Sequence, residues 1–201
     1  MPSWGATDAD ESKPKYLTDA EKKLVFANAS GWVLEAGSES SRFTGNDNAD
    51  ADPEILVAIG DLSTSIGAAD ITEVEMITTT ADKSEGFTIS VRVRYNEAVD
   101  VVTTGGTPTL AVTNGNEGTG TGRGPHSLSY ASGTGTNELV FSLAIAAANA
   151  ATNADDVLSV GAQSIALNSG TIKDAAGTAS NASLVISEAQ GTAAGSVTVT
   201  A

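Results

Sequence analysis

The densest group of candidate metal ligands is a run of oxygen-bearing side chains in a polar stretch of the chain. Calcium takes oxygen ligands, often from Asp and Asn at alternate positions of a short loop. The run consists of Asn46, Asp47, Asn48, Asp50 and Asp52. No glycine stands at the sixth position of such a loop, and the twelfth position is Val57 or Ile59, where a bidentate Glu is required. We therefore interpret the run as a solvated acidic turn and predict no metal site.

The single histidine, His126, is followed by Ser127, and this pair raises the question of nucleophilic catalysis. A Ser-His-Asp site needs a fold that brings base and nucleophile together, whereas neighbours in a strand point to opposite faces. One histidine and no cysteine also leave zinc and iron without a usual set of ligands. We predict that neither residue is catalytic.

Two further motifs have a chemical interpretation and a simpler structural one. Paired carboxylates such as Asp155 and Asp156 serve a glycosidase only across a cleft with aromatic sugar platforms, and this chain has 2 Trp and 3 Tyr. Residues 118–124, GTGTGRG, would need a following helix to hold a phosphate, but Pro125 and an expected strand come next. We interpret the first motif as a turn and the second as a flexible loop, with Arg123 placed for a surface contact. We therefore predict no catalytic residue, no cofactor and no enzymatic activity.

The composition limits both the partners and the bonds that stabilise the fold. The 201 residues carry 25 acidic and 10 basic side chains, a formal net charge of -15 that disfavours nucleic acid and anionic membranes as partners. There is no cysteine, so disulfides and thiolate metal sites are excluded. The first residues lack a basic start and an apolar core, and no run of eighteen apolar residues occurs. We expect neither a cleaved export signal nor a membrane span.

The clearest structural element is an alternating stretch from Phe87 to Tyr95. Every second residue is apolar or aromatic, and the residues between are Thr, Ser and Arg. A period of two over nine residues predicts a half-buried strand that must lay its apolar face against a second sheet. The 21 glycines and the low aromatic content, 4%, fit many short strands joined by small-residue turns.

Further short strands are predicted on both sides of this stretch, separated by turns rich in Gly, Asn, Asp or Pro. Their expected ranges are 71–79, 99–103, 109–113, 128–130, 138–145, 157–160, 165–167 and 184–186. Because no long helix lies between them, most should pair antiparallel, which favours a β-sandwich. A last strand at 196–200 could pair with its own sheet or with a neighbouring subunit.

The first third of the chain has a different character. Residues 1–16 are polar, and we interpret them as an extended arm. Its aromatic side chains could bind a partner or fold back on the domain. Thr18 and Glu21 form a capping-box pattern, which predicts a short helix over residues 19–29. A brief strand should follow at 31–34. Residues 54–67 could be a strand and a turn or a short helix, and we favour a strand at 55–59.

Several phrases in the second half resemble the immunoglobulin-like module of bacterial adhesion proteins, and the likeness spans about residues 71–187. The phrases are YNEAVDV (95–101), GTPTLAV (106–112), YASGTGTNELVFSLAI (130–145), DDVLSV (155–160) and SIALNSGTIKDAAGTAS (164–180). The resemblance implies a mainly β fold: an immunoglobulin-like Greek-key β-sandwich that acts as a spacer or a binding module, here with an N-terminal extension containing one short helix.

The front of the chain carries a second resemblance. Residues 4–35 and 54–75 are similar to the amino-terminal segments of virion structural proteins of marine T4-like tailed phages. This similarity implies a protein located in a virion, on the outer surface of the capsid. Phages commonly display immunoglobulin-like domains on heads and tails, so the two resemblances agree.

Together these features predict a capsid decoration or cement protein of a bacteriophage. Residues 1–70 would form a docking segment, 71–190 the sandwich and 191–201 a C-terminal strand or tail. The expected partners are the major capsid protein, neighbouring copies of the chain, and a polysaccharide of the host surface. The expected apolar anchors at the capsid or subunit interface are Trp4, Tyr16, Leu17, Phe26 and Trp32. The alternatives are a neck, tail or fibre-associated virion protein and a bacterial cell-surface adhesion module.

Overall fold

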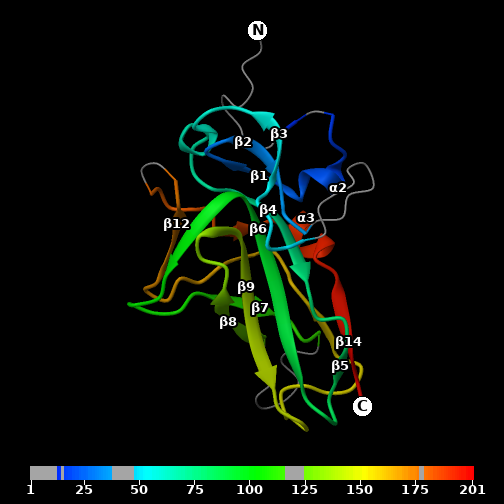
Figure 1. Cartoon of the computed structure of the whole chain (residues 1–201). Coiled ribbons are helices and arrows are strands. Elements are labelled where there is room, and N and C mark those ends of the chain that lie inside the picture. The colour runs from blue at the N-terminus through cyan, green and yellow to red at the C-terminus, as the bar shows by residue number, and fades with distance from the viewer. Residues whose placement is uncertain (1–12, 15, 38–47, 116–124, 177–178) are drawn as a thin grey trace.

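The structure is a computed structural model of the whole chain, and it describes residues 13–14, 16–37, 48–115, 125–176 and 179–201. These residues form a mainly β protein (Figure 1), as the sequence predicts. The helical segments are α2 (Asp19–Lys22), the 3-10 turn η1 (Leu62–Thr64) and α3 (Glu188–Ala193). The strands are β1 (Val25–Asn28), β2 (Gly31–Leu34), β3 (Glu54–Ala58), β4 (Ile71–Met76), β5 (Ala81–Asp82), β6 (Phe87–Val102), β7 (Thr109–Val112), β8 (His126–Ser132), β9 (Thr136–Ile145), β10 (Val157–Ser159), β11 (Gln163–Ser164), β12 (Thr171–Asp174), β13 (Val185–Ile186) and β14 (Ser196–Thr200).

A large open sheet is built around β6. Among the described residues it has nine strands in the order β3-β2-β1-β6-β9-β8-β7, and β4 and β12 also pair with β6. The first part of β6 runs antiparallel to β4 and β9, and its last residues run antiparallel to β12. The β1–β6 contact is parallel, through Ala27 and Glu97, so the sheet is mixed.

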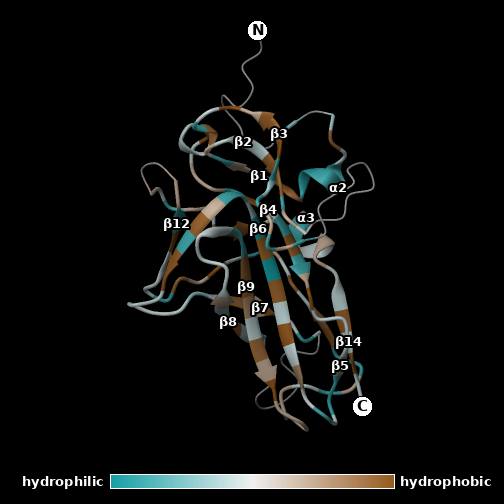
Figure 2. Cartoon of the chain, viewed as in Figure 1, coloured by the Kyte–Doolittle hydropathy of each residue, from teal (hydrophilic) through white to brown (hydrophobic). Residues whose placement is uncertain are grey.

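The alternation predicted for 87–95 is present along β6, where apolar and polar residues follow one another (Figure 2). Ile89, Val91 and Val93 are fully buried, and Tyr95 is 1% exposed. The strand does not stop there, however. The separate strand expected at 99–103 is the end of the same 16-residue strand, because residues 96 and 97 are buried and keep the backbone extended.

Two small sheets pack their buried residues into the same core as the large sheet. They are β10-β14-β5 and β11-β13. The tail strand β14 runs antiparallel to β10 and parallel to β5, and Val197 and Val199 are buried. The chain therefore pairs its tail within itself. The helix α3 before it was not predicted, although Ser187 and Gln190 form a capping box there.

The described residues from Lys13 to Thr64 form a small unit with its own core, which we call the front unit and which contains α2, β1, β2, β3 and η1. The predicted helix at 19–29 is wrong after Lys22, because Val25–Asn28 forms a strand that pairs with β2. In the turn between them, the Asn28 side chain accepts hydrogen bonds from the backbone N–H groups of Ser30 and Gly31. Gly31 has a φ of 136° and its backbone lies against Val57, where a Cβ atom would clash.

Candidate functional site

The front unit and the rest of the described chain have separate hydrophobic cores, although the pairing of β1 with β6 joins their strands in one sheet. The front cluster contains Leu17, Val25, Ala27, Trp32, Leu34 and Leu62. The large cluster contains buried residues from β4 to β14. The side chains that connect the two units near the end of β2 are charged, and we call this group the polar junction. It consists of Lys23, Glu35, Glu73, Glu75, Arg92, Arg94 and Glu138.

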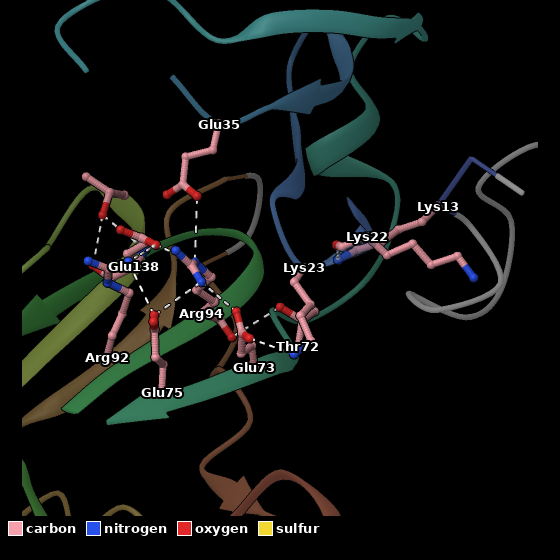
Figure 3. A network of polar contacts seen from close by, with 11 residues as sticks. Lys13, Lys22, Lys23, Glu35, Thr72, Glu73, Glu75, Arg92, Arg94 and Glu138 are labelled. Atoms are coloured by element: carbon pink, nitrogen blue, oxygen red, sulfur yellow. Dashed lines mark hydrogen bonds and ion pairs between the residues drawn. The ribbon is translucent and has the colours of Figure 1, made fainter. Parts of the chain in front are cut away.

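Arg94 lies at the centre of the polar junction (Figure 3), and its side chain is 10% exposed. It stands on the polar face of β6, and strand register places Glu73 of β4 and Glu138 of β9 on either side of it. Its Nη1 group donates to Glu73 Oε2 at 2.5 Å, and its Nε group donates to Glu138. Arg94 is thus held by carboxylates on both neighbouring strands.

Two contacts attach the front unit to the side chains of Glu73 and Arg94 on the sheet. Glu35, just after β2, places Oε2 3.6 Å from Nε of Arg94. Lys23, just after α2, places Nζ 2.8 Å from Oε1 of Glu73. Figure 3 shows both side chains reaching down from the front unit toward the sheet. The junction is therefore made by five segments of the chain: the residues that follow α2 and β2, and the strands β4, β6 and β9.

The charges of the polar junction balance when one carboxyl group keeps its proton. Three cations, Lys23, Arg92 and Arg94, face four acidic side chains. Burial raises the pKa of Glu35 to about 8, and a hydrogen bond to Glu138 and repulsion by its charge act in the same direction. Glu35 therefore holds a proton at neutral pH, which leaves three negative charges.

Glu73 is the carboxylate most firmly kept in its charged form. Burial acts to raise its pKa, but hydrogen bonds from Lys23 and Arg94 outweigh burial and lower the pKa below its ordinary value. Burial also acts to lower the pKa of Arg94, and the surrounding carboxylates, Glu138 first, raise it instead. The ionised row is thus Lys23–Glu73–Arg94, which runs from the front unit into the sheet.

A cavity of about 600 Å³ opens beside the polar junction, between the front unit and the sheet. Lysines form much of the front wall, and residues of β4, α3 and the segment between β12 and α3 form the other. The lining residues are Lys13, Asp19, Lys22, Lys23, Asp70, Ile71, Thr72, Ser183, Val185 and Gln190. Lys13 is 3% exposed, and its ammonium group donates to the backbone carbonyl of Lys22 at 2.7 Å. The seam between the two units is therefore polar and partly open.

The structure distributes the predicted interface anchors unevenly. Trp4 lies outside the described residues. Leu17 and Trp32 are buried in the front cluster, at 5% and 0% exposed, where they hold the front unit together. Tyr16 is 48% exposed and Phe26 is partly buried. The interface role of all five stays a prediction, and among the described side chains Tyr16 and Phe26 retain surface for a partner.

The structure also shows the surroundings of the other motifs that the sequence analysis considered, where their residues are described. His126 is buried, with Nε2 3.1 Å from the Thr152 hydroxyl, while Ser127 is exposed. Asp155 lies in the predicted turn before β10. Asn48 caps a turn by accepting from the N–H group of Asp50 at 3.0 Å. Asn46, Asp47 and residues 118–124 lie outside the described residues.

Comparison of the chain with known protein families, curated protein sequences and solved structures finds no match. In the part of the chain that the structure describes, no helix has the length and apolar character needed to cross a membrane. Within the same residues, no three or more His, Cys, Asp and Glu side chains are already grouped as a metal site.

Sequence reasoning missed the polar junction. It placed Arg92 and Arg94 on the polar face of their strand, but each of their acidic partners is at least 17 residues away in the sequence. The available signal was the alternation of Glu73 and Glu75 in a neighbouring predicted strand. Register between the strands was needed to turn that signal into pairs.

Proposed function

We propose that this chain is a structural protein of a phage virion, without enzymatic activity, that decorates the outside of the capsid. In this proposal the front unit docks on the major capsid protein and on neighbouring copies, and the remainder projects outward. The observation that carries it is the separate core of the front unit, which lies at one end of the molecule (Figure 1). A unit with its own core can hold a rigid docking surface while the rest of the chain is displayed.

We also propose that the projecting part is an immunoglobulin-like Greek-key sandwich. The phrases that resemble the bacterial module fall on strands in chain order: residues 95–101 in β6, 106–112 up to the end of β7, and 130–145 in β8 and β9. The run β6-β9-β8-β7 is antiparallel throughout. The Tyr95 hydroxyl donates to the carbonyl of Ser183, which ties this run to the chain beyond β12. The support for this proposal comes from the order and pairing of these strands, since no solved structure matches the chain.

The docking surface is expected to include the exposed apolar side chains of the front unit. Tyr16 is 48% exposed, and Ile55 on the edge strand β3 is 52% exposed. An edge strand with an apolar outer residue is suited to contact with another protein. Many copies on a lattice would add avidity, and binding to the assembled lattice alone would stabilise it by mass action.

The first experiment is immunogold electron microscopy of purified virions from the lysate in which the chain is produced, with an antibody against the full chain. Uniform label over the heads supports capsid decoration. Label confined to the neck or tail would replace it by the neck, tail or fibre alternative. Absence of label from intact virions would overturn the virion proposal and favour a cell-surface adhesion module.

A binding assay tests the docking surface itself. Tyr16→Ala and Ile55→Thr should each weaken co-sedimentation with capsids that lack the protein, by about 5- to 30-fold for a loss of about 1 to 2 kcal/mol. Val157→Thr is the matched control, because Val157 is 41% exposed on β10, outside the front unit. Equal weakening by all three changes would contradict docking through the front unit.

A further inference from the structure

The path of the large sheet from β3 to β7 has two ends, and the chain itself closes the β7 end. Along the outer side of β7, Thr109 and Thr113 each exchange a pair of backbone hydrogen bonds with the segment 159–166, at 2.8 to 3.1 Å. Between them, the side-chain amide of Gln163 accepts from the N–H group of Ala111 at 3.0 Å and donates to its carbonyl at 2.8 Å. The outward backbone groups of these alternate residues are all hydrogen-bonded, so this length of β7 offers no edge to another strand.

The β3 end of the same path is open. β3 pairs with β2 along one side, and no strand among the described residues pairs with its other side. The strand lies at the outside of the front unit (Figure 1). Edge strands are commonly protected by lysine, by proline or by a covering segment. The residues of β3, Glu54–Ala58, include neither lysine nor proline, and Ile55 is 52% exposed. A bulge at Leu56 twists the strand without covering its edge.

The charge on this edge decides how two copies could pair there. Residues 53–60 carry one charged side chain, Glu54, in a chain whose formal net charge is -15, so contact along this stretch meets little repulsion. In a parallel pair in register, the two Glu54 carboxylates would stand side by side, which is destabilising. In an antiparallel pair, each Glu54 lies toward the Ala58 end of the other strand, and the apolar residues 55–57 meet one another. The edge is therefore self-complementary in the antiparallel sense.

We propose that the outer edge of β3 pairs antiparallel with β3 of a second copy and joins two large sheets across a two-fold axis. The contact combines backbone hydrogen bonds with burial of the exposed Ile55 side chains. Because the β7 end is closed, the path has one open end in each molecule, and pairing stops at a dimer. The dimer specifies a contact between copies for the capsid proposal, but it is a property of the isolated chain and does not rest on that proposal.

Sedimentation velocity of the full chain from about 5 to 500 µM tests the proposal, because a short strand pair is expected to hold a dimer with a dissociation constant in about the micromolar range. The equilibrium should shift toward the dimer between 0.05 and 0.5 M NaCl, since salt screens the repulsion between two acidic chains. A chain that stays monomeric at every concentration would overturn the proposal and leave this edge to a strand of a different protein. Larger open assemblies would also overturn it, because they require a second edge.

Two substitutions at equally exposed apolar residues locate the contact. Ile55→Asp places a carboxylate on the paired edge and should weaken dimerisation at least about tenfold. Val102→Asp is the matched control, because Val102 is 51% exposed at the end of β6, outside the front unit, and this variant should dimerise like the wild type. Circular dichroism and the melting temperature establish that both variants are folded. Equal dimerisation of the two folded variants would overturn the proposal.

Cysteine cross-linking tests the pairing by a gain of signal. The chain contains no cysteine, so a single introduced cysteine is its only thiol. Ile55→Cys, Leu56→Cys and Val57→Cys are oxidised separately, and at least one should form a covalent dimer, because a disulfide needs Cα atoms within about 7 Å. Val102→Cys should stay uncoupled under the same conditions. Failure of all three β3 variants to cross-link at concentrations where the wild type dimerises would overturn the antiparallel pairing.

Discussion

Arg94 and Glu97 lie three residues apart on the same strand, both buried, and their surroundings are opposite. Arg94 meets acidic side chains from β4, β9 and the front unit. Glu97 meets two aspartates, and its carboxylate has no hydrogen-bond partner among the described residues. The first arrangement balances its charges inside the chain, whereas in the second burial and the two aspartates raise the pKa of Glu97 to about 8. Burial on this strand therefore goes with a charged side chain at one position and a protonated one at the other.

The largest effect is expected from removing Arg94, the cation at the centre of the polar junction. Arg94→Met should lower the free energy of unfolding by roughly 3–5 kcal/mol at pH 7, because it leaves buried carboxylates without their partner. Urea unfolding followed by circular dichroism measures the change. Arg92→Met is the matched control, since the Arg92 side chain is 29% exposed and should cost less. Equal losses for the two variants would show that Arg94 is not the centre of the junction.

The junction should also weaken as the pH rises. Glu35 has a folded-state pKa of about 8 and an ordinary pKa of 4.5, so its contribution is fully present below about pH 4.5 and is lost through pH 8. Above that pH, four negative charges among Glu35, Glu73, Glu75 and Glu138 face the three cations Lys23, Arg92 and Arg94. The slope for one proton is at most about 1.4 kcal/mol per pH unit.

Urea unfolding between pH 6 and pH 9 measures this slope. Glu35→Gln should make the slope shallower, because glutamine remains neutral and can still donate to Glu138, whereas Glu97, whose pKa burial also raises to about 8, keeps its own share of the slope. Glu188→Gln, which changes an exposed glutamate in the first turn of α3, should leave the slope as in the wild type. A slope unchanged by Glu35→Gln would mean that Glu35 is already ionised at neutral pH.

The smallest effect is expected at the edge of the junction. The Lys23 side chain is 42% exposed, so Lys23→Met should cost less than about 1 kcal/mol, and the cost should fall as salt is added. Unfolding in 0.05 and 0.5 M NaCl measures it. A loss as large as that of Arg94→Met would show that the front unit depends chiefly on Lys23 and Glu73 for its attachment.

Much of the strand pattern was predictable because it is local. Strands at 31–34, 55–59 and 196–200 were expected within one residue of where they occur. The helix predicted at 19–29 was too long, because the capping box specifies only where a helix starts. Beyond the first turn, pairing of Val25–Asn28 with β2 outweighed helix propensity. Residues 96–98 were taken for a break because polar side chains inside a long buried strand are unusual.

The candidate sites were less predictable than the strands. Tyr16 and Trp32 look alike in sequence as interface anchors, yet one is exposed and the other fully buried. Glu97 was part of a phrase used to identify the module, and nothing in that phrase indicates that its carboxylate is buried without a hydrogen-bond partner in the part of the chain that the structure describes. Exposure and pairing depend on chain segments that are distant in sequence.

The sequence by itself determined the mainly β class, the position of most strands, the start of α2 and the strongly acidic surface. These follow from side-chain periodicity, capping residues and composition, which act over a few neighbouring residues or over the chain as a whole. Only the tertiary structure decided that β6 continues to Val102, that Arg94 has acidic partners and that the Glu97 carboxylate has no hydrogen-bond partner among the residues described. Strand register sets which side chains meet, and register depends on contacts between segments that the local pattern does not specify.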